Sequence, residues 1–241
     1  MRTMDAARIE HHLIGDIYDA ALNPTLWSGV LGRIATLVHA NSAIITALHT
    51  LNPDYALAFT HNIPEETLRV YSERGLDALD MEINGAPLKH SGVGSMMFSS
   101  TAYGSQEEYV RRCGELYSHC FAPSNIHYLC GTLLDHGDFR WAAIGFHRPA
   151  SATAFTPEEA TPVRRLAPHI RRALHIHRQL ASVQNLNARL YRTLDGLTTG
   201  VILLNRHGLI RYANTQAERL LRDHGSLRVT VREGLHAALP A

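Results

Sequence analysis

Residues 156–159, Thr-Pro-Glu-Glu, form the strongest helix-start signal in the chain. A threonine caps a helix well, a proline suits the first helical position, and a glutamate three residues after the cap completes a capping box. The helix predicted to start here continues to about residue 194, well beyond the usual length of a helix in a globular protein. A helix this long favours two lobes joined by a connector, and we predict that connector over residues 156–197.

Apolar side chains follow a heptad pattern in the second half of this helix. With Leu166 at position a, positions a and d from residue 180 onward are apolar except for one asparagine, which is typical of a two-stranded coiled coil with a fixed register. His169 and Ala173 fit such a seam poorly, so the alternative is a single helix that packs on the chain's own sheet. The residues predicted to form a dimer seam are Leu180, Val183, Asn187, Leu190 and Leu194.

The chain before residue 156 mixes the periods of helices and strands. Apolar residues at three- and four-residue spacing predict helices, alternating apolar residues predict strands, and Ser105 with Glu108 forms a second capping box. Asn52-Pro53-Asp54 and residues 135–138 are predicted hairpin turns. The predicted helices are 6–22, 26–39, 64–74 and 105–119, and the predicted strands are 42–50, 55–61, 96–100, 126–134 and 139–147.

The chain after residue 198 repeats this mixture on a smaller scale. We predict strands over 200–204, 209–213 and 227–231, and short helices over 215–222 and 233–239. The fold class predicted for the whole chain is therefore α+β.

Composition excludes several classes of protein. Hydrophobic residues make up 45% and charged residues 19%, and the formal net charge is +1. A surface for nucleic-acid phosphates needs a clustered basic excess, which these residues lack. No apolar stretch resembles a membrane span or a signal peptide. The three cysteines form no CxxC pair, so we expect a cytoplasmic protein with reduced thiols.

Motifs for catalysis and for metal binding are missing. The 16 histidines include His175 and His177, but two residues two positions apart on a helix face different ways and cannot share a metal. There is no HExxH, no phosphate-binding loop and no Rossmann glycine pattern, and residues 92–95, Gly-Val-Gly-Ser, do not match the nucleophile elbow. We therefore expect no enzyme activity, no metal and no cofactor.

A pocket for a small apolar ligand is the functional site that the sequence favours. Adaptable methionines precede a run of small residues at 99–101, and aromatic residues and cysteines lie on neighbouring predicted elements. Ordinary core packing is the alternative for all of these side chains, and alternation leaves open which face of the 126–134 strand meets a pocket. The candidate lining residues are Phe59, Met96, Met97, Tyr109, Cys113, Tyr117, Tyr128, Cys130 and Trp141.

Two stretches carry a resemblance to known families. Residues 17–24, Ile-Tyr-Asp-Ala-Ala-Leu-Asn-Pro, with Trp27 and the later 166–174, Leu-Ala-Pro-His-Ile-Arg-Arg-Ala-Leu, resemble the GAF-like sensor domain of LuxR-type transcription regulators over residues 1–180. Residues 200–210, Gly-Val-Ile-Leu-Leu-Asn-Arg-His-Gly-Leu-Ile, followed by 212–214, Tyr-Ala-Asn, resemble the opening of a PAS domain. That family usually has aspartate where Asn205 stands, and either side chain satisfies a turn.

The resemblance implies a division of labour along the chain. It implies a GAF-like sensor domain with an antiparallel sheet over 1–155, the connecting helix over 156–197, and a partial PAS-like domain over 198–241. A ligand would bind between the first sheet and residues 75–119, and a homodimer would pass the signal to a DNA-binding helix-turn-helix outside these residues. The alternatives are a ligand-free dimerisation module that recognises a protein partner and, third, a haem or redox sensor.

Overall fold

The computed structural model describes residues 2–51, 56–223, 227–230 and 234–237. Its contacts divide the chain into two compact units, residues 1–179 and 180–241, which are treated separately below. The fold is α+β, with a five-stranded antiparallel sheet, flanking helices and one long helix. Within the described residues, no helix combines the length and the apolar character that a membrane crossing requires.

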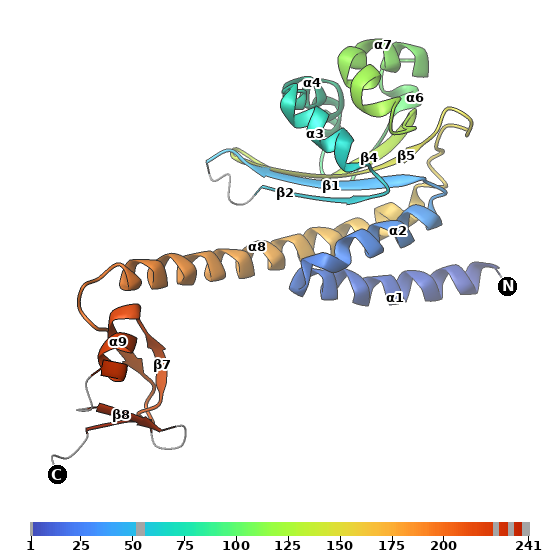
Figure 1. Cartoon of the computed structure of the whole chain (residues 1–241). Coiled ribbons are helices and arrows are strands. Elements are labelled where there is room, and N and C mark those ends of the chain that lie inside the picture. The colour runs from blue at the N-terminus through green and yellow to red at the C-terminus, as the bar shows by residue number, and fades with distance from the viewer. Residues whose placement is uncertain (1, 52–55, 224–226, 231–233, 238–241) are drawn as a thin grey trace. The chain divides into compact units, whose positions relative to one another are not determined.

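A five-stranded sheet is the centre of the first unit (Figure 1). The strands lie in the order β2-β1-β5-β4-β3, and every described pairing between them is antiparallel. The predicted hairpins are both present, although Asn52-Pro53-Asp54 lies outside the described residues. The strands are β1 (Ser42–His49), β2 (Leu57–His61), β3 (Met96–Phe98), β4 (Tyr128–Gly137) and β5 (Arg140–Arg148).

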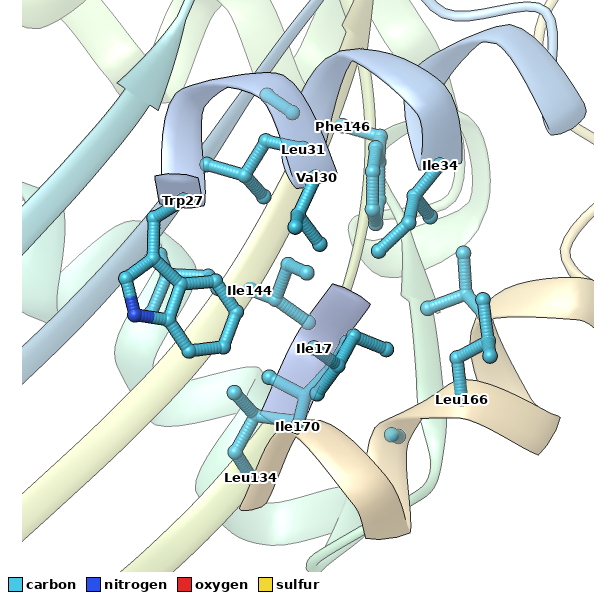
Figure 2. Packing of buried hydrophobic residues seen from close by; sticks show 14 of the residues in the cluster. Ile17, Trp27, Val30, Leu31, Ile34, Leu134, Ile144, Phe146, Leu166 and Ile170 are labelled. Carbon is cyan, nitrogen blue, oxygen red and sulfur yellow. The ribbon is translucent and has the colours of Figure 1, made fainter. Parts of the chain in front are cut away.

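One face of this sheet is covered by α1 (Arg2–Leu22), α2 (Trp27–Leu37) and the first part of α8 (Thr161–Asp195) (Figure 1). A short 3₁₀ turn, Pro24–Leu26, separates α1 from α2 because Asn23 caps it and Pro24 interrupts helical bonding. Figure 2 shows the main core of the unit, where α2, α8 and β5 meet. Its fully buried side chains include Trp27, Ile34, Ile144, Phe146 and Ile170.

The other face carries a layer of short helices (Figure 1). Two of its segments are π-helical, and Ser105 caps α7 by accepting a hydrogen bond from the Glu108 amide at 3.2 Å. The Glu108 carboxylate pairs with Arg111 and Arg112 instead of completing the predicted capping box. Because the helices are short, this layer has three small apolar clusters instead of one continuous core. Its elements are α3 (Glu65–Glu73), α4 (Asp77–Asp80), η3 (Met81–Gly85), α5 (Ala86–Ser91), α6 (Ser99–Ala102), α7 (Gln106–Leu116) and η4 (Tyr117–Phe121).

Arg148 fixes the end of β5 to the segment that leads into α8. Its side chain is only 3% exposed, and its guanidinium donates to the carbonyl oxygens of Val38 at 2.7 Å and of His39 at 3.0 Å. It also pairs with Glu159 at 3.1 Å and lies 4.0 Å from the centre of the Phe155 ring. Both hydrogen bonds of the predicted Thr156–Glu159 capping box are present, but α8 itself starts at Thr161.

The second unit contains the end of α8 and a small α+β group. β6 (Ile202–Leu204) pairs with β7 (Ile210–Ala213), and α9 (Thr215–Asp223) follows. Asn214 organises them, because its fully buried amide accepts from the Val201 and Ala217 amides and donates to the Leu194 and Thr199 carbonyls, all at 2.8–2.9 Å.

One predicted element of this unit is wrong. Residues 234–237, expected within a helix over 233–239, form strand β9 (Gly234–Ala237), which pairs with β8 (Leu227–Thr230). The helix signal consisted of one glutamate before a short apolar run, and the antiparallel partner at 227–230 satisfies the backbone of that run instead.

Candidate functional site

A cavity of about 360 Å³ lies between the sheet and the layer of short helices. None of its lining residues comes from α1, α2 or α8, so it lies on the sheet face opposite the main core. The lining is Ile44, Thr46, Ala58, Ile63, Thr67, Leu68, Tyr71, Asp80, Met81, Asn84, Gly85, Leu88, Cys120, Phe121, Ile126, Leu129, Gly131, Trp141, Ala143, Ile144, Gly145 and His147.

Small residues on the sheet create this hollow. Alternate residues of a strand face opposite sides, so Trp141, Ala143, Gly145 and His147 of β5 face the cavity while their neighbours pack in the main core. Gly145 is paired with Gly131 of β4, so the two glycines lie side by side in the floor. The missing side chain at Gly145 leaves room that the helices above do not fill, whereas Gly131 allows the close approach of the Ile144 carbonyl oxygen.

Asp80 provides the acidic group of the cavity. Its carboxylate accepts hydrogen bonds from Asn84 Nδ2 at 2.7 Å and from the Tyr71 hydroxyl at 2.9 Å. It keeps some accessible surface because it borders the cavity, yet the surrounding protein removes most of its hydration. This burial raises the pKa of Asp80, an effect that the two hydrogen bonds oppose and the nearby Asp77 carboxylate reinforces.

His147 is the second polar group in the floor. The residue is 3% exposed, and its Nδ1 lies 3.0 Å from the Ser42 hydroxyl of the neighbouring strand. Burial lowers the pKa of His147 to about 4, so the ring is uncharged at neutral pH.

The remaining lining is apolar or uncharged. It contains neither lysine nor arginine. Cys120 lines the cavity, but burial raises the pKa of its thiol, and it also raises the pKa of Cys113 to about 11, so neither thiol is activated. Within the described residues, no three histidine, cysteine or acidic side chains are grouped to hold a metal ion.

The structure places one of the nine candidate lining residues, Trp141, in the cavity wall. Phe59, Met96, Tyr128 and Cys130 pack with the main core on the opposite face of the sheet. Met97, Tyr109, Cys113 and Tyr117 lie in clusters of the helical layer, next to the cavity or behind its lining. Tyr109 still supports the site, because its hydroxyl donates to Asn84 at 2.9 Å.

Asp80, His147 and the glycines of the floor were not among the predicted lining residues. Asp80 lies in the 75–94 stretch, which shows no clear periodicity, and nothing in the sequence distinguishes it from the neighbouring acids Asp77 and Glu82. A usable signal was present on β5, where small residues alternate with large ones from Ala143 to Phe146. Alternation of this kind indicates that one face has space beside it, which is what the cavity requires.

Comparisons with known proteins give the fold but no family. No protein-family model matches the chain, and no curated protein matches it either. The LBD domain of VqsR from Pseudomonas aeruginosa is similar in structure, with a TM-score of 0.51 and 13% identity, over 69% of this chain and 94% of that one. Residues 1–171 of SdiA from E. coli give a TM-score of 0.50 and 10% identity, over 75% of this chain and 98% of that one.

The chain shares the fold of these two domains. A third similar structure is the N-acylhomoserine lactone-dependent LuxR-family transcription factor CepR2 from Burkholderia cenocepacia. Its TM-score is 0.44 at 12% identity, over 72% of this chain and 98% of that one.

Proposed function

We propose that this chain is the sensory region of a LuxR-type transcription regulator, and that a small, mostly apolar molecule binds in the cavity beside Asp80 and His147. The observation that carries the proposal is the cavity itself, because about 360 Å³ of mostly apolar space with a few convergent polar groups is typical of small-molecule sites. The fold shared with the VqsR and SdiA domains supports it. A ligand-free interaction module has no need of such a space.

The charges of the lining residues restrict the class of ligand that the cavity can bind. Asp80 is present without any lysine or arginine in the wall, so a carboxylate ligand would be buried near an acid without a counter-charge. Uncharged amphiphiles such as acyl esters, acyl amides and lactones avoid that cost. The proposed ligand class is therefore an uncharged molecule with an apolar chain and a small polar head.

The rest of the chain is assigned to signal transmission. We assign residues 1–155 to a GAF-like sensor, 156–197 to the connecting helix, and 198–241 to a PAS-like region whose two strands and helix, β6, β7 and α9, occur in the expected order. The net charge of +1 supports assigning DNA contacts to a helix-turn-helix outside these residues. We assign the protein to the cytoplasm.

Ligand binding is expected to raise the melting temperature of the first unit. Both tryptophans, Trp27 and Trp141, lie in this unit, so their fluorescence reports its unfolding. An uncharged C8 amphiphile such as N-octanoyl homoserine lactone, at a hundred times its Kd, stabilises by about 2.7 kcal/mol and raises the midpoint by about 5 °C or more. Octanoate is expected to give no rise.

Ala143→Phe is the matched control, because it fills the cavity floor with a ring and is expected to abolish the shift. If no uncharged amphiphile in a panel of chain lengths changed the wild-type midpoint, the ligand-binding proposal would be wrong.

The chain is further expected to form a dimer through the end of α8. Leu180, Val183 and Leu190 are 40%, 57% and 53% exposed within the single chain, although they occupy seam positions of the heptad pattern. Leu190→Glu places a charge in the seam, and we expect it to shift sedimentation from dimer to monomer. Asn185→Glu adds the same charge on the outer face of the helix and should leave the dimer intact. A wild-type monomer at tens of micromolar would contradict the seam.

A further inference from the structure

We propose that His147 donates a hydrogen bond from Nε2 to a carbonyl oxygen of the ligand, and that Gly145 provides the notch in which this carbonyl lies. The inference rests on the proposed function and names the group of the ligand that the cavity floor recognises.

The notch follows from the positions around Gly145. A methyl group placed on Gly145 would lie 3.5 Å from His147 Nε2 and 3.6 Å from the Ile44 side chain. The imidazole edge therefore lies beside the bare backbone of Gly145, and all three residues line the cavity. A side chain at position 145 would occupy the space in front of Nε2, and glycine leaves that space open.

The hydrogen bonding of Ser42 determines which nitrogen of the His147 ring carries the proton. Ser42 is 3% exposed, and within the described part of the chain its hydroxyl has His147 Nδ1 as its single hydrogen-bond partner. If Nδ1 carried the proton, the buried serine hydroxyl would have no acceptor. The arrangement that satisfies both groups has Ser42 donating to Nδ1, which leaves the proton on Nε2.

The donor at Nε2 then needs an acceptor from the ligand. No described residue forms a hydrogen bond with Nε2, and the oxygens of Asp80 accept from Tyr71 and Asn84. A bound apolar ligand excludes solvent from this corner, so a ligand without an acceptor would leave the N–H unpaired. Discrimination of about tenfold or more between ligands with and without the acceptor is expected from such a group.

A pair of probes isolates the carbonyl. 1-Octanoylglycerol and 1-O-octylglycerol have the same head and chain length, and the ether lacks the ester carbonyl. Titration calorimetry on the full wild-type chain is expected to give at least tenfold tighter binding of the ester. In His147→Phe this preference should fall below about twofold, and His147→Gln, which keeps an N–H donor, should restore part of it. Gly145→Ala should weaken ester binding about tenfold.

The control variant is His12→Phe, which changes an exposed histidine on α1, on the other face of the sheet. It should keep the wild-type preference. Equal affinity for ester and ether in the wild type, or an unchanged preference in His147→Phe, would overturn the inference and leave the proposed function standing. If neither probe bound, the proposed function would be contradicted, and the inference that rests on it would be wrong as well.

A second measurement needs no variant. Long-range ¹H–¹⁵N correlation spectra of histidine-labelled wild-type protein distinguish the two neutral forms of the His147 ring. The proton is expected on Nε2, and a proton on Nδ1 would overturn the proposed donor.

Discussion

Arg148→Met is expected to destabilise the first unit by about 3–5 kcal/mol, the range found when one partner of a buried ion pair is removed. The guanidinium joins α2, β5 and the segment before α8 through the carbonyls of Val38 and His39 and the carboxylate of Glu159. Methionine has a similar length and keeps the apolar contact with Phe155, but it leaves the Val38 and His39 carbonyls without their side-chain donor and Glu159 without its cationic partner. Urea unfolding followed by tryptophan fluorescence measures the effect.

The matched control is Arg33→Met. Arg33 pairs with Asp16 at 3.0 Å, but the two side chains are 54% and 36% exposed, so the pair is screened by solvent. A loss of less than about 1 kcal/mol is expected there. Equal losses for the two variants would show that Arg148 contributes no more than a surface ion pair.

Signals between neighbouring residues predicted much of the fold. The cap at Ser105, the capping box at 156 and the proline before α3 depend on contacts within a few residues, so they hold wherever the elements lie in the fold. The strands of the two hairpins followed from alternation and turn residues in the same way. The helix expected over 233–239 was wrong because a strand partner, not a local cap, decides the conformation there.

The position of the site depends on contacts between elements that lie far apart in the sequence, and local sequence patterns do not predict such contacts. Tyr128 and Cys130 were candidates because they alternate with Leu129 and Gly131, and alternation alone does not say which set faces the helical layer. In the structure, Leu129 and Gly131 line the cavity, and Tyr128 and Cys130 pack in the main core. Large adaptable side chains suggested a pocket, whereas the space lies above the small residues Ala143 and Gly145 and is bordered by polar groups from distant elements.

His147 is expected to make the first unit acid-sensitive between pH 6.5 and 4. The pKa of this histidine falls from 6.5 to about 4 in the folded state because its ring is buried. Below pH 6.5 the unfolded chain therefore binds a proton at this histidine that the folded chain does not bind until about pH 4. The contribution of neutral His147 to the free energy of unfolding is thus complete above pH 6.5 and is lost as the pH falls toward 4. A difference of about 2.5 pH units corresponds to about 3 kcal/mol.

The test compares the wild type with the double variant Ser42→Ala/His147→Phe by urea unfolding at pH 7.5, 6, 5 and 4.5. Asp80 borders the same cavity and its raised pKa acts in the opposite direction, favouring the folded state at low pH, but it is common to both proteins and cancels in the difference. Below pH 6, the free energy of unfolding of the wild type should fall relative to that of the variant by about 1.4 kcal/mol per pH unit. A gap that stayed constant with pH would mean that the ring reaches solvent and accepts a proton when folded, and the neutral donor proposed for the ligand carbonyl would then lose its physical basis.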